Sequence, residues 1–224
     1  MSVNIEFYKE VTTYLQLNKV QLIAVSKTKP NEAILDLHQL GQKDFGENYV
    51  QELVDKAAAL PKDIHWHFIG HLQSNKVKYI APFVYLIHGV DSEKLLIEIN
   101  KQAQKNNRII DVLLQVHIAS EETKFGFDEL TLMELIQSGR LTNYTNIKLR
   151  GLMGMASFSD DTVVVQNEFS SLKHTYNKAQ TLLNTAHFDQ LSMGMSSDYK
   201  LAIQQGTTMV RIGSLLFGAR VYNQ

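Results

Sequence analysis

Short runs of apolar and β-branched residues alternate with longer segments of helical period along most of this chain. After an opening helix expected at residues 5–17, eight runs have the length and composition of strands. They are QLIAVS from Gln21, KDFGEN from Lys43, HWHFIG from His65, YLIHGV from Tyr85, IIDVLLQVHI from Ile109, IKLRGLMGM from Ile147, FDQLSM from Phe188 and TMVRIG from Thr208. This alternation predicts βα units and a parallel sheet rather than a sandwich.

The segments between these strands have the periodicity of helices. The longer ones are NEAILDLHQLG, NYVQELVDKAAAL, SEKLLIEINKQAQKNN, DELTLMELIQSG and VVVQNEFSSLKHTYNKAQTLLNTA. Pro30, Ser92 and Asp128 are suitable residues for helix starts. The intervals after residues 65–70 and 193–195 are shorter, so the helices there should be small.

Eight strands, each followed by a helix, is the count of a closed (β/α)8 barrel. We therefore expect a single α/β domain over residues 1–224, with an extra N-terminal helix at 1–18 and the barrel over about 20–220. An open doubly wound sheet is the alternative. No G-x-G-x-x-G follows the first strand to support the dinucleotide site typical of that fold.

Composition narrows the classes of partner. Lysine and arginine number 22 against 23 for aspartate and glutamate, so no strong positive field favours nucleic acid. The chain has no cysteine, which excludes disulfides and thiolate metal sites. Its start lacks the pattern of a signal peptide, and no apolar run is long enough to cross a bilayer. We expect a cytoplasmic protein without a nucleic-acid or membrane partner.

Lys27 is the first candidate for chemistry, because barrel enzymes carry their functional residues at the carboxyl ends of strands. A lysine that ends a buried strand faces a partly dry pocket, which favours the neutral amine that forms imines. From spacing alone, a lysine that simply faces solvent fits equally well.

The last two strands end in groups that could bind phosphate. Ser196 and Ser197 precede a helix, and Gly213 and Ser214 follow the final strand, where backbone N–H groups often hold phosphate in this fold. Helix capping is the alternative explanation for the serines. Arg211 lies among apolar neighbours, so its charge needs either a carboxylate partner or a ligand.

Two histidines and several methionines complete the candidates. His65 and His67 flank one residue of a strand and face the same side, so they could share a metal ion, but no third ligand stands at a recognisable spacing. Met195 belongs with Met153, Met155 and Met193, which we expect to pack the barrel and the wall of a pocket.

Six motifs resemble those of a known family. They are AVSKTKP at 24–30, FGENYVQE at 45–52, HFIGHLQSNK at 67–76, GLMGM at 151–155, LSMGMSSD at 191–198 and MVRIGSLLFGAR at 209–220. As a set they resemble the pyridoxal phosphate homeostasis proteins, over almost the whole chain. That family is similar in fold to the barrel domain of alanine racemase, which implies a fold-type III site for pyridoxal 5′-phosphate (PLP).

The resemblance also implies residue roles. Lys27 would form a Schiff base with the cofactor, and Arg211 would face its pyridine nitrogen. The remaining roles are phosphate binding by Ser196, Gly213 and Ser214, and lining or support of the pocket by Asn48, His67 and Asn75. Lys124 matches a lysine that the family places on a mobile loop, with an unsettled role.

We expect a carrier rather than an enzyme. An arginine opposite the pyridine nitrogen favours the unprotonated ring, a weak electron sink. By the same resemblance, alanine racemase takes a second base from an additional β-domain across a dimer. The chain ends at Gln224, soon after the FGAR motif, which leaves no room for that domain. A monomer that serves vitamin B6 homeostasis and passes PLP to PLP-dependent apo-enzymes is the expected function.

Two enzyme classes are the alternatives. A weak amino-acid racemase would need His88, His117 or a tyrosine as its second base. A barrel hydrolase would use His65 and His67 with a metal ion.

Overall fold

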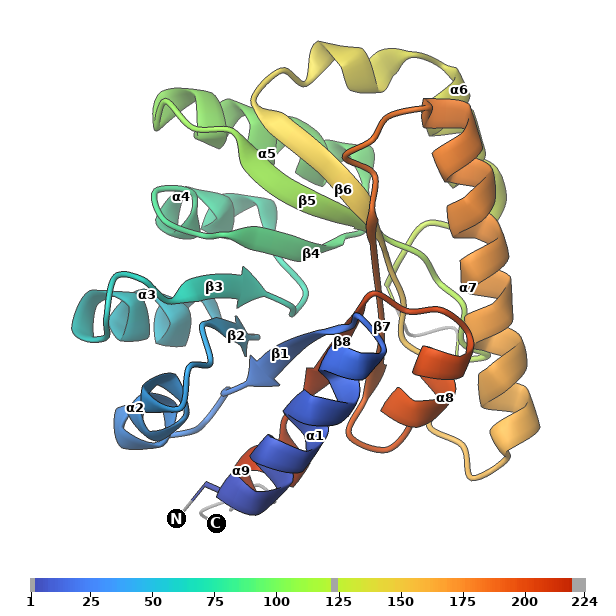
Figure 1. The fold of residues 1–224 in the computed structure, drawn as a ribbon. Helices are drawn as coiled ribbons and strands as arrows, with labels where there is room; N and C mark the ends of the chain where they lie inside the picture. Colours follow the sequence, from blue (N-terminus) through green and yellow to red (C-terminus); the bar gives the residue numbers. More distant parts are fainter. Residues whose placement is uncertain (1–2, 122–124, 219–224) are drawn as a thin grey trace.

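Eight parallel strands close into a barrel in the order of the chain (Figure 1). The computed structural model describes residues 3–121 and 125–218. The strands are β1 Gln21–Val25, β2 Asp44–Glu47, β3 His65–Phe68, β4 Leu86–Val90, β5 Ile110–Gln115, β6 Ile147–Met153, β7 Gln190–Met195 and β8 Met209–Ile212. Closure comes from the pairing of β1 with β8, which sets Ile23 beside Arg211. The closed barrel is therefore confirmed and the open sheet is excluded.

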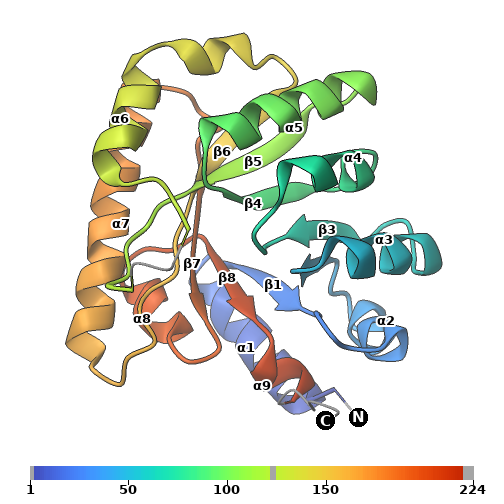
Figure 2. The ribbon, with the colours of Figure 1, turned by 180° about the vertical axis from the view of Figure 1, so that it is seen from behind.

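Helices surround the barrel on its outer side, as both views show (Figures 1 and 2). They are α1 Ile5–Leu17, α2 Asn31–Gln39, α3 Val50–Ala59, η1 Ser74–Lys76, α4 Val77–Ile80, α5 Glu93–Lys105, α6 Glu129–Gln137, η2 Arg140–Asn143, α7 Thr162–Leu183, α8 Tyr199–Gln204 and α9 Ser214–Phe217. The helices after β3 and β7 are short, as predicted. None of the helices in the described ranges is long and apolar enough to span a membrane.

The helix starts follow from local side-chain chemistry. Ser92 and Asp128 accept hydrogen bonds from backbone N–H groups in the first turns of α5 and α6, as their positions predicted. Pro30 precedes α2 without a side-chain bond. α7 ends three residues before the predicted end, because Asn184 adopts a left-handed conformation with φ 45°.

Side chains alternate between two apolar regions along each strand. The larger region lies between the strands and the helices, and it holds Trp66, the single tryptophan, 6.2 Å from the ring of Phe45. A small cluster fills the barrel interior: Ile23, Leu86, Leu113, Met153 and Met209. Because successive strand residues face opposite sides, the polar residues in step with this cluster also point inward.

The extra helix α1 packs against β1 and α9. Its start is capped by Asn4, whose side chain accepts from the N–H of Phe7. The backbone N–H of Asn4 donates to the carbonyl of Leu216 at 2.8 Å, which ties the start of α1 to the end of the barrel's last unit. Tyr8, Val11 and Leu15 form its buried face.

Candidate functional site

A cavity of about 500 Å³ opens at the carboxyl ends of the strands. Ligand pockets commonly have this size. Nine of the residues predicted from the sequence line it: Lys27, Asn48, Met155, Met195, Ser196, Ser197, Arg211, Gly213 and Ser214. The other lining residues are Val25, Ile69, Phe158 and Leu215. The fold thus gathers one amine, several hydroxyls and one guanidinium from β1, β2, β7 and β8 around an apolar space.

Lys27 lies in a tight turn after β1. The N–H of Lys29 donates to the carbonyl of Ser26 at 3.0 Å, which closes the turn around Lys27 and Thr28. Thr28 has a φ of 62°, a region that β-branched residues rarely adopt. Its N–H donates to Glu52 Oε1 at 2.6 Å, and this bond helps to hold the strained conformation. The position of Lys27 is therefore fixed by its neighbours on both sides.

A buried ion pair supports this turn from behind. Lys56 Nζ donates to the carbonyl of Ser26 and to Glu47 Oε1, both at 2.8 Å, and to Glu52 Oε1 at 2.6 Å. Ser26 Oγ donates to the same oxygen of Glu47 at 2.6 Å. Burial raises the pKa of Glu47, and the charge of Lys56 opposes that rise. Helical periodicity alone does not reveal the role of Lys56, because a lysine on a helix is usually exposed.

The ends of β7 and β8 meet at Ser196 and Gly213. The N–H of Gly213 donates to Ser196 Oγ at 3.2 Å, and Ser214 begins α9 directly afterwards. Asp198 precedes α8 but does not cap it with its side chain, which accepts from the N–H of Met195 at 2.5 Å. The serine hydroxyls at this edge thus line the cavity.

Arg211 enters the cavity from the barrel wall and is 3% exposed. Its Nη1 donates to the carbonyl and the hydroxyl of Ser192 at 3.0 and 2.6 Å, and its Nη2 donates to the carbonyl of Gly154 at 3.0 Å. These three acceptors are uncharged. Burial lowers the pKa of Arg211 to about 10, against the opposing charge of Asp198, so the guanidinium stays protonated at neutral pH.

Behind Arg211, a row of polar side chains crosses the barrel interior. Ser192 Oγ lies 3.2 Å from His88 Nδ1, His88 Nε2 lies 3.0 Å from His67 Nδ1, and His67 Nε2 lies 3.0 Å from Asp44 Oδ1. We call these five residues, Arg211, Ser192, His88, His67 and Asp44, the interior network. Its five members come from five strands, β8, β7, β4, β3 and β2, and no local sequence pattern connects them.

One polar atom in the cavity is left without a partner. Asn48 Oδ1 is buried and finds no hydrogen-bond partner within the described chain. A buried, unpaired amide oxygen is costly unless something satisfies it, so its place in the cavity fits a ligand with a hydrogen-bond donor. At the rim, Phe158 is 94% exposed. The cavity therefore has an exposed aromatic residue among its lining residues and one unpaired acceptor in its wall.

The remaining predicted residues lie elsewhere. His67 belongs to the interior network and not to the lining of the cavity. Asn75 lies in η1, also outside the lining residues. Lys124 falls outside the described residues. His65 Nδ1 and His67 Nε2 both contact Asp44 Oδ1, and the described ranges hold no cluster of three or more side chains suited to a metal ion.

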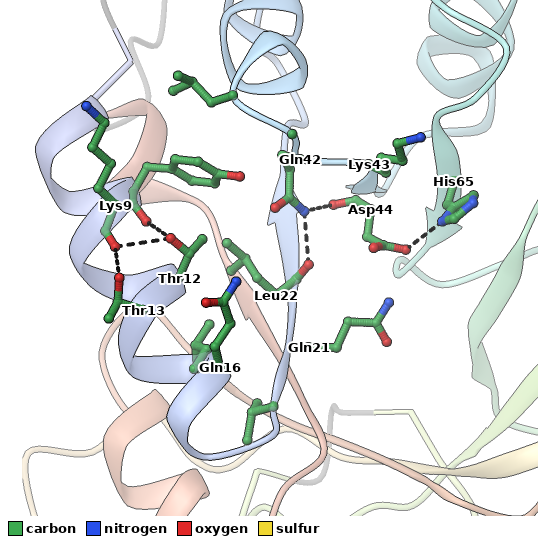
Figure 3. Close-up of a pocket in the computed structure, with 15 residues that line it drawn as sticks. Lys9, Thr12, Thr13, Gln16, Gln21, Leu22, Gln42, Lys43, Asp44 and His65 are labelled. Carbon is green, nitrogen blue, oxygen red and sulfur yellow. Dashed lines mark hydrogen bonds and ion pairs between the residues drawn. The ribbon is translucent and has the colours of Figure 1, made fainter.

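A second cavity, of about 580 Å³, lies at the opposite end of the barrel (Figure 3). Gln21, Asp44 and His65, which begin β1, β2 and β3, line it together with α1. Its polar groups largely satisfy one another. Gln42 donates to the carbonyls of Leu22 and Asp44 at 3.0 and 2.6 Å, and Asp44 Oδ1 lies 3.1 Å from His65 Nδ1.

Comparison with known proteins identifies relatives over nearly the whole chain. The family described as the alanine racemase N-terminal domain matches residues 4–221. The pyridoxal phosphate homeostasis protein of Aquifex aeolicus is 43% identical over 92% of this chain and 89% of its own length. That of Escherichia coli K12 is 38% identical over 92% of this chain and 88% of its own length.

Solved structures agree with the sequence comparison. PipY of Synechococcus elongatus, solved with PLP bound, is 37% identical with a TM-score of 0.80 and covers 89% of this chain and 93% of its own. Alanine racemase from Bartonella henselae is 16% identical with a TM-score of 0.73, covering 97% of this chain and 60% of its own. The second likeness shows the fold alone. Taken with the barrel and the family match, these relatives show that the chain belongs to the pyridoxal phosphate homeostasis protein family, whose members share the barrel of the alanine racemase N-terminal domain.

Proposed function

We propose that this protein binds PLP in the cavity at the carboxyl ends of the strands, holds it covalently on Lys27 and passes it to PLP-dependent apo-enzymes. The observation that carries the proposal is the meeting of Lys27, the serine hydroxyls and Arg211 in one cavity of suitable size. The PLP that PipY binds, and the names of the curated relatives, support the choice of cofactor.

The residues present fit each part of this cofactor. When bound, PLP supplies an electrophilic aldehyde carbon, and the Lys27 amine adds there to form an imine while water leaves. Ser196 and Ser214, with the backbone at the start of α9, would bind the phosphate. Asn48 Oδ1 would accept a hydrogen bond from a ring substituent, which removes its unpaired state.

Arg211 and the wall residues would hold the pyridine ring. The apolar side chains of Ile69, Met155 and Leu215 offer the ring a dry surface. The guanidinium can only donate hydrogen bonds, so it would favour the unprotonated pyridine nitrogen. A ring in that state stabilises carbanions poorly, which supports a carrier over an efficient catalyst.

A racemase remains the second candidate, and the placement of its possible bases weighs against it. His88 is fully buried and already bonded to His67 and Ser192. His117 Nε2 lies 2.9 Å from the carbonyl of Glu121. Within the described part of the chain, the cavity lining includes no histidine or tyrosine. The lining thus offers Lys27 without a facing second base, and this supports the carrier.

The central test is optical. Wild-type protein mixed with PLP should develop the visible absorbance of an imine, and borohydride should fix the cofactor to the chain. Lys27→Ala should lose the band completely, whereas Lys43→Ala, a change at the opposite cavity, should keep it. A colourless wild-type protein would overturn cofactor binding on this residue.

Two further measurements test the carrier role. Loaded protein should restore activity to a PLP-dependent apo-enzyme in the presence of a scavenger that consumes free PLP. Amino acids incubated in deuterated water with the loaded protein should exchange their α-hydrogen no faster than with free PLP. Rapid exchange would replace the carrier with an enzyme.

A further inference from the structure

The interior network joins the two cavities through the centre of the barrel. It begins at Arg211, which lines the cavity at the carboxyl ends of the strands, the carboxyl-end cavity. It ends at Asp44, which lines the second cavity, at the amino ends of the strands, the amino-end cavity (Figure 3). Its three internal members, Ser192, His88 and His67, are fully buried. A buried row of polar groups is stable only if every donor meets an acceptor, so its proton positions can be worked out.

The direction of the hydrogen bonds follows from Arg211. The guanidinium donates to Ser192 Oγ, which leaves the serine proton for His88 Nδ1. Neutral His88 then carries its proton on Nε2 and donates it to His67 Nδ1. His67 in turn carries its proton on Nε2 and donates it to the carboxylate of Asp44. All bonds therefore point from the cation towards the anion.

The reverse direction fails for uncharged histidines. If His88 Nδ1 carried the proton, its Nε2 would accept from His67 Nδ1. The remaining nitrogen of a neutral His67 would then face the carboxylate of Asp44 with a lone pair, which is repulsive. Only a doubly protonated His67 would repair that contact.

The surroundings keep the two histidines neutral. Burial lowers the pKa of His67, against the favourable carboxylate of Asp44, and nearby His65 lowers it further. Burial also lowers the pKa of His88 well below its usual value, as do His67 and Arg211. The other titratable ring against His67 is Tyr85, at 5.4 Å between centroids.

We propose that Ser192, His88, His67 and Asp44 are positioning residues that hold the Arg211 guanidinium for its contact with the pyridine ring, and that the Asp44 carboxylate acts on Arg211 through the bonds between them. This inference deepens the proposed function and rests on it for the ligand. Its physical basis is that all the hydrogen bonds point the same way. Each group polarises the next, so the uncharged members link the buried cation of Arg211 to the carboxylate of Asp44.

The first test needs no cofactor. The full chain is labelled with nitrogen-15 in its histidines, and the side-chain nitrogens are observed by NMR at about pH 7.5, above the usual pKa of histidine. His67 and His88, assigned from His67→Gln and His88→Gln, should both be neutral with the proton on Nε2. A proton on Nδ1 of either ring, or a doubly protonated His67, would overturn the arrangement.

The second test measures coupling between the ends of the interior network. Ser192→Ala should weaken PLP binding about tenfold, because it removes a hydrogen bond to a charged group, and Ser192→Thr should restore most of it. Asp44→Asn keeps an acceptor but removes the charge, and should weaken binding about threefold in the wild-type background. In the Ser192→Ala background, Asp44→Asn should have no further effect.

A merely structural role predicts a different result. Residues that do not communicate give factors that multiply, so Asp44→Asn would then weaken binding equally in both backgrounds. That outcome would overturn the proposal even with normal folding. Wild-type protein without an imine band would instead overturn the proposed function, and the NMR arrangement would still decide the interior network. If a substitution prevents folding, the wild-type NMR result stands as the test.

Discussion

The two ends of the barrel carry polar groups in different states. At the amino end, Gln42 bonds to two carbonyls and Asp44 contacts both His65 and His67, so the polar groups largely satisfy one another. At the carboxyl end, Asn48 Oδ1 is buried without a partner in the described chain. If PLP binds where we propose, cavity size does not identify the binding end, since the amino-end cavity is the larger. The unpaired oxygen of Asn48 is then the better guide.

The two ends of the barrel also differ in the interactions that stabilise them. The turn that carries Lys27 depends on the buried charges of Lys56 and Glu47, whereas β1 and β2 at the amino end are joined by the neutral amide of Gln42. Removing one member of a buried ion pair costs more than removing a neutral hydrogen bond. The stability of the two ends should therefore respond differently to comparable substitutions.

Lys56→Met should have the largest effect. It leaves the buried carboxylate of Glu47 without its cation, and breaking a buried pair in this way costs about 3–5 kcal/mol in the free energy of unfolding. Urea denaturation measures the loss, with exposed Lys101→Met as the matched control. A loss no larger than that of the control would show that the ion pair does not hold the Lys27 turn.

Acid should destabilise the folded protein through the two buried histidines of the interior network. His67 and His88 have lowered pKa values in the folded protein, so the unfolded chain binds more protons once the pH falls below the usual histidine pKa. The free energy of unfolding should therefore drop by about 1–3 kcal/mol between pH 7.5 and 5.5. His88→Gln should flatten this dependence, and exposed His174→Gln should not. A flat profile in the wild type would contradict neutral, buried histidines.

Gln42→Leu should cost less than Lys56→Met. The change leaves the carbonyls of Leu22 and Asp44 without their amide donor. This loss should lower the free energy of unfolding by about 1–2 kcal/mol. PLP affinity should stay unchanged, because the amide bonds to backbone carbonyls and not to the Asp44 carboxylate that ends the interior network. Gln16→Leu, an exposed position on α1 in the same cavity, is the control for stability. Weaker PLP binding by Gln42→Leu would show that this amide also acts on the cavity at the carboxyl ends of the strands.

Asn48→Ala should have the smallest effect on stability. Its buried oxygen has no partner to lose, so the free energy of unfolding without PLP should change by about 0.5 kcal/mol or less. PLP affinity should nevertheless fall about tenfold, as expected for a lost ligand hydrogen bond. A clear loss of stability without PLP would instead give Asn48 a structural role.

Much of the fold could be predicted from the sequence because periodicity is local. Eight strands with helices between them identified the barrel, and Ser92 and Asp128 predicted two helix starts. The residues at which helices end could be predicted less well. The period of α7 continues past residue 183, but the left-handed Asn184 ends the helix, and only the backbone shows that.

The candidate site could be predicted only in part. Motifs at strand ends identified Lys27, Ser196 and Arg211, which line one cavity. The interior network could not be found, because His88 and Ser192 are 104 residues apart and nothing in either strand indicates the other. Lys56 was also missed, since helical spacing does not distinguish a buried lysine from an exposed one.

Trp66 has a practical consequence for these measurements. It is the single tryptophan of the chain, is buried against Phe45 and stands between His65 and His67 on β3. When light that tyrosine does not absorb excites the protein, the emission therefore reports from one known point of the barrel wall. A pyridoxal imine absorbs in the range where tryptophan emits, so loading should dim this signal by energy transfer. Tryptophan fluorescence should therefore measure the fraction of the protein that holds PLP.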